Sequence, residues 1–454
     1  MTSVRIGAGQ GFYGDVITAA VDMARLGGVR YMAFDALAEL TLAILQKDRQ
    51  RDAHLGYARD LPAAMRVLLP LCRQQGIRLI TNAGGLNPPG AAAQVVQVAR
   101  ELRLRGLRVA TVTGDDLLGR LDALRAGGAD LRHAQTGAPF EAIADRLVFA
   151  NAYLGARPIV DALAQGAHVV VAGRVADSAL FLAPAVFELG WAWDDWDRLA
   201  GGTVMGHLLE CSGQATGGNF GGWQTVPDPW RLGYPLAEVY DDGRCVISKP
   251  PGTGGLVTFD TVREQLLYEV HDPARYMAPD VVVDFTTVRL HDLGGDRVLV
   301  EGATGRRRPD HLKAVLGYHA GWMGEGRIGY CWPDALAKAR RAAQILQHRF
   351  EMAGVRCEEV RVEYQGVDSL HGPLSPPPAD DLAEVYLRVA VRTRTQEDAA
   401  RVARELPYLG LNGPPGIGGY GGITPPRELL GLWPVLIPRG MVEPAIQVVV
   451  EEVG

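Results

Sequence analysis

The stretch from Gly206 to Phe220 carries side chains that can transfer protons. If it is helical, His207, Glu210, Cys211 and Gln214 fall at positions i, i+3, i+4 and i+7 and form one polar stripe. Histidine and glutamate act as general acids and bases, and histidine four residues before cysteine suits an activated thiolate pair or two metal ligands. The spacing HxxEC does not match the usual zinc motifs, so we expect no metal. The alternative is a packed hydrogen-bonded network.

We expect His207, Glu210 and Cys211 to be catalytic. The glycine-rich loop that follows the stripe should reach over the site. Within this stretch we therefore expect the substrate to be bound by Gln214, Gly217 and Gly218.

A second group of candidates follows the first apolar run. The segment Gly7 to Asp15 contains GxGxxG at Gly9, Gly11 and Gly14, and Asp35 closes the next apolar run. This pattern is the dinucleotide fingerprint, in which a phosphate lies at a helix N-terminus. We favour the alternative, a tight turn that serves another ligand, and expect Gly9, Gly11 and Asp15 to contact substrate.

Asp35 and Glu39 form a pair of acids at the end of the second run. On a helix they are i and i+4, so both carboxylates would share one face and could divide into acid and base or bind a metal. The alternative is a helix cap followed by a first-turn acid. We expect both residues to be catalytic.

The other apolar runs also end in polar residues that suit recognition of a carboxylate or carbonyl group. A turn, a cap or a salt bridge between Arg174 and Asp177 would account for them without a ligand. We expect substrate to be bound by Asn82, Gly84, Gly85, Asp115, Asn151, Arg174 and Asp177.

These residues need a scaffold that brings strand ends together. Residues 1–190 alternate between short apolar runs and amphipathic helical segments, which predicts about six βα units in a doubly wound, mostly parallel Rossmann-like sheet with helices on both faces. Ligands bind beyond the carboxyl ends of such strands. The residues expected to converge there are Asp15, Asp35, Asn82, Asp115, Asn151 and Arg174.

The character of the chain changes twice. Residues 191–332 contain a predicted helix at 202–212 and several strands, and we interpret them as a mixed β-rich substrate or cap region. Residues 333–454 begin with a capped helix that ends near Gly354, followed by alternating strands and a helix at 396–405. They predict a C-terminal α+β sandwich.

Composition excludes several classes of function. The chain has 454 residues, 46 Lys and Arg against 52 Asp and Glu, and a net charge of −6, so it lacks the basic field of a nucleic-acid-binding protein. No apolar run approaches the roughly 18 residues of a membrane span. The five cysteines are scattered, which favours a reducing, cytoplasmic location.

In sequence the chain resembles the acyclic terpene utilisation family, AtuA. The resemblance rests on motifs whose order is kept over residues 4 to about 330. They are Gly7 to Asp15, YMAFDALAELT at 31–41, TNAGGLNP at 81–88, GDD at 114–116, Asn151 to Gly155, AGRVAD at 172–177, GHLLECSGQATGGNF at 206–220 and EQLLYEVHDPARY at 264–276. It implies a cytoplasmic catabolic protein that acts where branched or unsaturated acids are degraded, often as CoA thioesters.

Acids, bases and oxyanion donors together suit proton abstraction next to a carbonyl. We therefore expect a hydratase or lyase acting on a small carboxylate or acyl-CoA. The alternatives are an NAD(P)-dependent oxidoreductase and a non-catalytic binding subunit of a multi-enzyme complex. We expect no tightly bound cofactor, CoA only as a moiety of the substrate, and a homo-oligomer or a complex with a small partner subunit.

Overall fold

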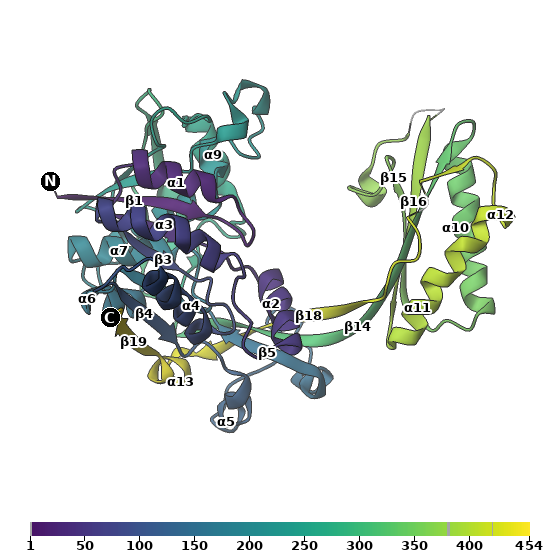
Figure 1. Ribbon diagram of the computed structural model, residues 1–454, viewed down its shortest axis with the longest axis horizontal. Helices are drawn as coiled ribbons and strands as arrows, with labels where there is room; N and C mark the ends of the chain where they lie inside the picture. The colour runs from purple at the N-terminus through teal and green to yellow at the C-terminus, as the bar shows by residue number, and fades with distance from the viewer. Residues whose placement is uncertain (1, 379–381, 420) are drawn as a thin grey trace. The chain divides into compact units, whose positions relative to one another are not determined.

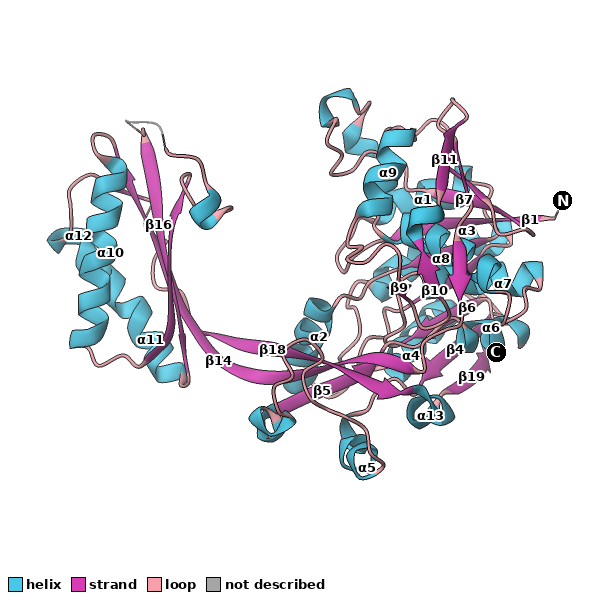
Figure 2. Cartoon of the chain, turned by 180° about the vertical axis from the view of Figure 1, so that it is seen from behind, coloured by secondary structure: helices cyan, strands magenta, loops and turns pink. Residues whose placement is uncertain are grey.

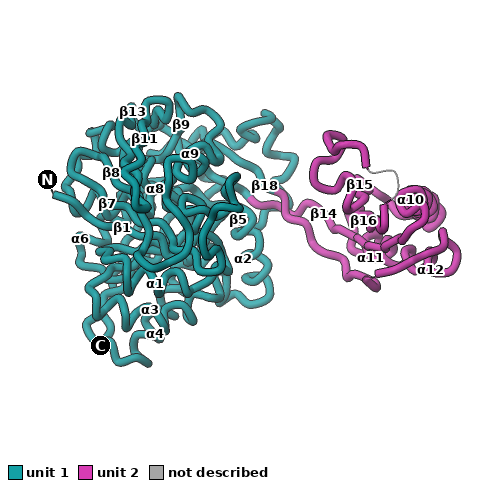
Figure 3. The backbone as a smooth tube through the Cα atoms, turned by 90° about the horizontal axis from the view of Figure 1, so that it is seen from above, with its two compact units in different colours: residues 1–316, 432–454 teal, residues 317–431 magenta. Residues whose placement is uncertain are grey.

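The computed structural model describes residues 2–378, 382–419 and 421–454. Two compact units divide the chain: unit 1 is Met1–Leu316 with Leu432–Gly454, and unit 2 is Gly317–Gly431 (Figure 3). These units do not follow the predicted boundaries at residues 190 and 332. Among the described helices, none has both the length and the apolar character that crossing a membrane requires.

Unit 1 is built on a ten-stranded sheet with the order β11-β12-β8-β7-β1-β2-β3-β6-β4-β19. Its centre is parallel and contains five of the six predicted apolar runs. These strands are β1 (Ser3–Gln10), β2 (Tyr31–Phe34), β3 (Arg78–Thr81), β6 (Val169–Ala172) and β4 (Arg108–Thr113). All residues of β2 and β6 are buried, as expected for strands covered on both faces.

Helices cover both faces of the parallel strands. The chain advances from β1 through β2 and β3 to β4, then returns to β6. Right-handed crossovers therefore put the outward helices on one face and those of the return on the other. The outward helices that pack together are α1 (Ile17–Leu26), α3 (Leu61–Gln75) and α4 (Pro88–Glu101), and α6 (Arg157–Ala164) belongs to the return. Helix α2 (Glu39–Arg51) precedes α3 in the same crossover. Figure 1 shows α1, α3 and α4 side by side.

The predicted Rossmann-like winding is not confirmed, although the α/β class is. In the dinucleotide-binding fold the first strand lies in the middle and the chain winds outward from it on both sides. Here β1 ends the parallel set, and the antiparallel β7 (Leu236–Tyr240) pairs with its free edge. The sixth run, β5 (Leu147–Ala152), pairs with β14 (His311–Cys331) and not with the parallel strands.

Residues 191–316 extend the same unit. Helices α7 (Ala179–Leu189) and α8 (Trp196–Glu210) pack side by side (Figure 2), and α8 also contacts α9 (Phe259–Leu267). Strands β8 (Cys245–Ser248), β12 (Val298–Glu301) and β11 (Arg289–Asp292) continue the large sheet, whereas β9 (Tyr276–Met277), β10 (Val282–Asp284) and β13 (Thr304–Arg306) form a small one. The chain end returns as α13 (Arg439–Val442) and β19 (Gln447–Glu452), which pairs with β4. A short helix, α5 (Leu121–Ala126), follows β4.

Whereas the sequence pattern predicted an α+β sandwich at residues 333–454, unit 2 is an α+β unit that covers residues 317–431. Its strands follow the order β15-β16-β14-β17, with β15 (Cys357–Gln365), β16 (Glu384–Thr393) and β17 (Ile417–Gly418), and β18 (Arg427–Pro438) also pairs with β14. Helices α10 (Ala335–Met352), α11 (Gln396–Glu405) and α12 (Leu409–Asn412) complete it. The alternating residues Val385, Leu387, Val389 and Val391 are buried against α10, as their pattern predicts.

Candidate functional site

Three carboxylates meet beyond the carboxyl ends of the parallel strands. Asp35 follows β2, Asp177 lies in the loop after β6, and Glu210 is the last residue of α8. Each offers one oxygen, and the three oxygens lie within 4.8 Å of one another. We call these residues the acid cluster. Three segments that are distant in the sequence thus bring like charges together, an arrangement typical of functional sites.

Asn82 fixes the position of Asp35. Because β2 and β3 pair in parallel with Phe34 opposite Thr81, the residues that follow them are neighbours. The Asn82 Nδ2 donates to Asp35 Oδ1 at 2.6 Å, and its Oδ1 accepts from the Ala36 N–H at 2.7 Å. Both side chains are buried. The amide therefore holds one carboxylate oxygen of Asp35 and leaves the other for the acid cluster.

Asp115 links the ends of the next strands. Its Oδ2 accepts from Asn151 Nδ2 and from the Arg174 backbone N–H, both at 2.8 Å. Gly173 permits this close approach, since a Cβ there would lie 2.5 Å from the Asp115 carboxylate. Burial raises the pKa of Asp115 to about 6. The predicted residues Asp115, Asn151 and Arg174 are therefore brought together.

The buried guanidinium of Arg174 lies beside the acid cluster. Its Nη1 donates to Asp177 Oδ1 at 2.7 Å and to the Leu37 carbonyl at 2.8 Å, and its charge lies 4.0 Å from the centre of the Tyr153 ring. The Arg174 side chain is only 2% exposed, yet its Nε has no hydrogen-bond partner among the described residues. A buried donor without a partner is costly, by about 1–3 kcal/mol, and suits an oxyanion ligand.

His207 and Glu210 share a proton. The His207 Nε2 lies 2.9 Å from the Gln265 carbonyl of α9, which can only accept, so Nε2 carries a hydrogen. The Nδ1 lies 3.0 Å from Glu210 Oε1. Either Glu210 is protonated and donates to a neutral imidazole, or an imidazolium donates to a carboxylate. In both cases one proton lies between the two side chains.

Burial raises the pKa values of two members of the acid cluster, Asp35 and Glu210. It raises the pKa of Asp35 well above its usual range, and the charge of Asp177 adds to the effect. Burial also raises the pKa of Glu210 to about 7, against the stabilising contact with His207. For His207, burial lowers the pKa but the hydrogen bond and charge of Glu210 outweigh it, so the net pKa is raised. Groups that hold and release protons near neutral pH are suited to general acid–base chemistry.

The predicted pairing of Asp35 with Glu39 on one helical face is wrong. Helix α2 begins only at Glu39, after the extended Ala38, so Asp35 is not helical. Glu39 accepts instead from the Tyr153 hydroxyl and from Lys313 Nζ, the latter at 2.8 Å. These hydrogen bonds outweigh burial and lower the pKa of Glu39 to about 2. Glu39 is therefore a permanent anion in an ion pair and a poor proton carrier.

The predicted helical stripe also differs from the structure. Helix α8 ends at Glu210, Cys211 follows it, and Gln214 lies in a separate turn of 3-10 helix. Both ring nitrogens of His207 are occupied by Glu210 and Gln265, and burial raises the pKa of the Cys211 thiol. An activated thiolate pair does not fit this geometry. His207 and Glu210 are 1% and 7% exposed, so both side chains are buried, as in the packed hydrogen-bonded network given as the alternative.

Asp15 forms a neighbouring group of its own. Its carboxylate accepts from the Gly11 N–H at 3.0 Å and from the Ser212 and Tyr234 hydroxyls at 2.5 Å each. It lines a cavity of about 470 Å³ whose walls also include Gly11, Cys211, Gln214 and Gly218 among the predicted residues. None of the three residues of the acid cluster lines this cavity. Cys211, which follows Glu210 in the chain, is part of its wall.

The first turn after β1 does not resemble a phosphate-binding turn. A Cβ at Gly11 would lie 2.1 Å from the Ser212 N, so the backbone after α8 occupies the space beside this glycine. At Gly9, the ring of Phe34 lies where a Cβ would be, at 2.4 Å. The acid of the fingerprint, Asp35, is hydrogen-bonded to Asn82 inside the protein. These contacts favour the interpretation of GxGxxG as a tight turn.

Other predicted glycines serve packing. The Gly84 N–H donates to the Ala172 carbonyl at 3.1 Å and the Gly85 N–H to the Asn82 carbonyl at 3.1 Å, so neither is free for a ligand anion. Gly217 has a φ of 110° and lies against Val226.

The sequence interpretation missed four residues that contact the site. Tyr153 and Gln265 belong to motifs that were recognised, but neither was assigned a role. Tyr234 and Lys313 come from strands or loops without any local motif, and only the folded chain brings them to Asp15 and Glu39. No local signal in the sequence marks these two.

The donor set of the acid cluster also defines what it can hold. Carboxylate oxygens are the ligands of hard divalent cations such as Mg²⁺. The neighbouring Arg174 guanidinium already supplies a positive charge through Asp177, and His207 supplies a shared proton at Glu210. The arrangement therefore neutralises its charge with protons and a guanidinium, which suits acid–base chemistry.

Comparison with models of known families identifies the family of this chain. The model of the family described as "Acyclic terpene utilisation family protein AtuA" matches residues 4–448 of the 454. No curated protein matches the chain.

Proposed function

The chain belongs to the acyclic terpene utilisation family, and from this premise we propose that it is a hydratase or lyase of that catabolism, acting on a branched or unsaturated carboxylic acid or its CoA thioester. The observation that supports the reaction type is the acid cluster: two buried carboxyls with raised pKa values beside a buried arginine. In many enzymes that transfer protons at neutral pH, one carboxyl of a pair is protonated and the other is ionised.

The proposed reaction adds water across the double bond next to the carbonyl. The ionised member of the pair Asp35 and Glu210 takes a proton from water, the resulting hydroxide bonds to the β-carbon, and the protonated member gives its proton to the α-carbon. The proton then returns between the two carboxyls, whose oxygens lie within 4.8 Å. Elimination of water is the reverse.

Arg174 is the proposed substrate anchor. Its buried Nε has no partner among the described residues and would donate to the substrate carboxylate or thioester oxygen. Negative charge develops on this oxygen during α-proton transfer, and a fixed donor there stabilises the transition state. Asp177, whose side chain is 36% exposed, is the member of the acid cluster that faces solvent.

The experiment is turnover of a panel of branched unsaturated acids and their 3-hydroxy counterparts, each free and as the CoA thioester. Mass spectrometry detects gain or loss of one water. Glu210→Gln and Asp35→Asn should each reduce the rate by about 10²-fold or more, the usual scale for general acid–base groups. Asp145→Asn is the matched control, because Asp145 is 82% exposed and lies outside the site.

Other results would redirect the assignment. Turnover that needs added NAD(P) would support the oxidoreductase alternative, and the absence of turnover across the panel would support a non-catalytic subunit. Equal rates in Glu210→Gln and Asp145→Asn would contradict the assignment of proton transfer to the acid cluster.

A further inference from the structure

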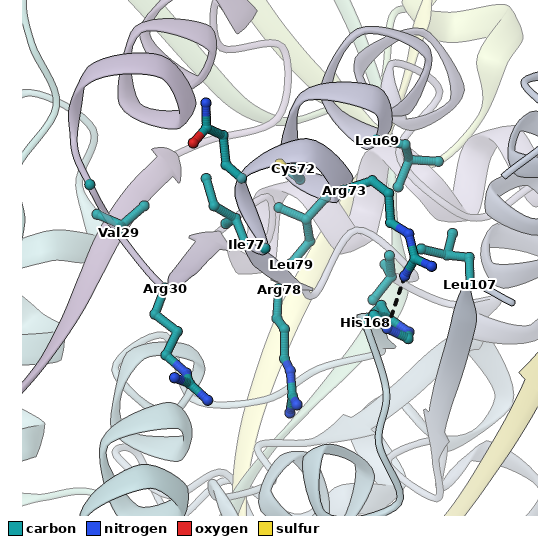
Figure 4. A pocket seen from close by; sticks show the side chains of 14 residues that line it. Val29, Arg30, Leu69, Cys72, Arg73, Ile77, Arg78, Leu79, Leu107 and His168 are labelled. Atoms are coloured by element: carbon teal, nitrogen blue, oxygen red, sulfur yellow. Dashed lines mark hydrogen bonds between the residues drawn. The ribbon is translucent and has the colours of Figure 1, made fainter.

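A second cavity lies at the other edge of the parallel sheet. Its volume is about 510 Å³, and its walls come from the amino ends of β2, β3 and β6 and from the carboxyl end of α3 (Figure 4). The acid cluster lies beyond the carboxyl ends of the same strands. The cavity is thus separate from the proposed active site, and its volume is within the usual range for small-molecule sites.

The lining of this cavity is basic and apolar. It includes Arg30, Arg73, Arg78 and His168 and contains no Asp or Glu. The remaining wall is mostly apolar, formed by Val29, Leu69, Cys72, Ile77, Leu79, Leu107 and Val169. A concave surface with several cations, no anion and an apolar wall suits an organic anion with an apolar part.

His168 presents an N–H group to this cavity. Its Nδ1 accepts from the Arg108 backbone N–H at 3.0 Å, so Nδ1 carries no proton. The other nitrogen, Nε2, therefore carries the hydrogen of the neutral ring. Burial, together with the charges of Arg73, Arg78 and Arg108, lowers the pKa of His168 and keeps the ring neutral.

Arg73 meets this N–H group with a donor of its own. The Arg73 Nη1 lies 3.3 Å from His168 Nε2 (Figure 4). A guanidinium has only donors, so the two groups cannot bond to each other once Nδ1 is the acceptor. Two convergent donors at a basic surface are satisfied when one acceptor atom binds both. The two convergent donors are therefore a second indication of an anion site, in addition to the cationic residues in the cavity wall.

Few carboxylates compete for this position. Arg30 is paired with Glu188 at 2.8 Å, and Glu452, which faces His168, is paired with Arg108 at 3.1 Å. Arg73 has no carboxylate partner within 4.0 Å among the described residues, and neither has Arg78. Arg73 therefore remains available for an external anion, whereas the Arg78 guanidinium donates to the Leu163 carbonyl at 3.5 Å and lies 5.7 Å from the centre of the Phe187 ring.

We propose that this cavity binds a small organic oxyanion, a carboxylate or a phosphate ester, whose charged oxygen bridges Arg73 Nη1 and His168 Nε2 and whose apolar part lies against Leu69, Ile77 and Leu107. Arg78 contributes a further positive charge. The site is distinct from the acid cluster and does not depend on the proposed reaction.

Isothermal titration calorimetry of the full chain tests this assignment with four probes: hexanoate, hexyl phosphate, inorganic phosphate and neutral hexanol. We expect hexanoate or hexyl phosphate to bind more tightly than inorganic phosphate, and hexanol not to bind. Whichever of hexanoate and hexyl phosphate binds more tightly shows whether the site prefers a carboxylate or a phosphate ester. Arg73→Gln should weaken binding at least about 10-fold, because it removes a charge-assisted hydrogen bond.

Arg66→Gln is the matched control, because Arg66 lies on the same helix with its side chain 53% exposed and outside the cavity. It should bind the probes as the wild type does. Arg73 is itself exposed, so Arg73→Gln should fold normally. Three results would overturn the proposal: no saturable binding of any anion, undiminished binding in Arg73→Gln, or hexanol binding as tightly as hexanoate. Dependence on Arg73 also separates this site from substrate binding at the acid cluster.

Discussion

At the scale of single residues, the proton held between His207 and Glu210 is the central feature. Sequence spacing placed the two residues on one helical face, and the structure confirms their contact at 3.0 Å. The sequence did not show that α9 covers the ring or that the Gln265 carbonyl fixes its tautomer. Burial depends on which distant segment packs over a side chain, so a local motif identifies the residues but not their environment.

Stability should decrease as pH rises because of this pair. The folded state raises the pKa of Glu210 to about 7, so between pH 4.5 and about 7 the folded protein binds a proton that the unfolded chain has released. The raised pKa of His207 acts in the same direction. The contribution is therefore complete at acid pH and is lost as pH rises through the folded pKa. Thermal unfolding across this range should show a flatter pH dependence in Glu210→Gln, and an unchanged slope would contradict the shift.

His207→Ala should lose stability as well as activity. The variant leaves the buried Glu210 carboxyl without its His207 partner, at a cost of about 1–3 kcal/mol, whereas the Gln265 carbonyl keeps the Tyr268 N–H at 3.1 Å. The variant also removes the ring that packs on Phe285 with centroids 5.6 Å apart. A denaturant titration measures the loss, and the activity per folded molecule is compared separately. A stable variant with normal activity would show that the pair is dispensable.

At the scale of elements, the end of α8 is positioned by one glycine, Gly206. A Cβ at Gly206 would lie 2.6 Å from the Ser178 carbonyl and 2.9 Å from the Ser178 Cα, so α8 approaches the start of α7 at backbone contact. Glu210 is one helical turn further along α8. The packing of α8 on α7 therefore sets where the carboxyl of Glu210 meets Asp35 and Asp177.

Gly206→Ala should accordingly displace α8 and reduce both stability and activity. Overpacking against a backbone that cannot yield typically costs about 1–3 kcal/mol. The melting temperature and the turnover rate should fall together. Gly119→Ala is the control, because its Cβ would meet nothing within 4 Å, and it should behave like the wild type. Full activity in Gly206→Ala would mean that the position of Glu210 does not depend on this contact.

Prediction of elements from the sequence succeeded where the pattern is local. The six N-terminal apolar runs are all strands, and the helix predicted at 396–405 is α11. The long strand β14 was missed, because the glycines at 317, 321, 324, 326 and 329 weaken any strand pattern. Glu39 was assigned to the site from its spacing to Asp35. In the structure the helix begins only at Glu39, and its carboxylate pairs with Lys313, so Glu39 does not share a helical face with Asp35.

At the scale of the whole molecule, strand order could not be predicted from periodicity. Alternating β and α patterns identify a parallel sheet, but they do not say that β5 leaves it or that β7 and β19 extend it from far along the chain. Strands from the predicted regions 1–190 and 191–332 share this one sheet, and the region 333–454 contributes β19 to it. Asp35, Asn82, Asp115 and Arg174 still come together, because their parallel strands end at the same edge of the sheet. Asn151 joins them from β5 through its bond to Asp115, whereas Asp15 lies in a neighbouring group of its own.

The purified protein should contain no NAD(P) and bind none tightly. The turn after β1 is packed against Ser212, and Asp35 is held by Asn82, so the groups that usually bind the pyrophosphate and the ribose are occupied. Absorbance of the purified chain and equilibrium dialysis with NADH and NADPH measure this directly. Binding of either nucleotide in the sub-micromolar range would contradict the proposed function and favour the oxidoreductase.

Exchange of the α-hydrogen in D₂O tests the central claim most directly. The protein is incubated in D₂O with the acyl substrates of the panel, and mass spectrometry follows deuterium at the carbon next to the carbonyl. We expect catalysed exchange in the wild type, an exchange rate reduced by at least about 10²-fold in Glu210→Gln, and an unchanged rate in Asp145→Asn. Exchange that is equally fast in Glu210→Gln, or absent with every substrate, would contradict proton transfer by the acid cluster.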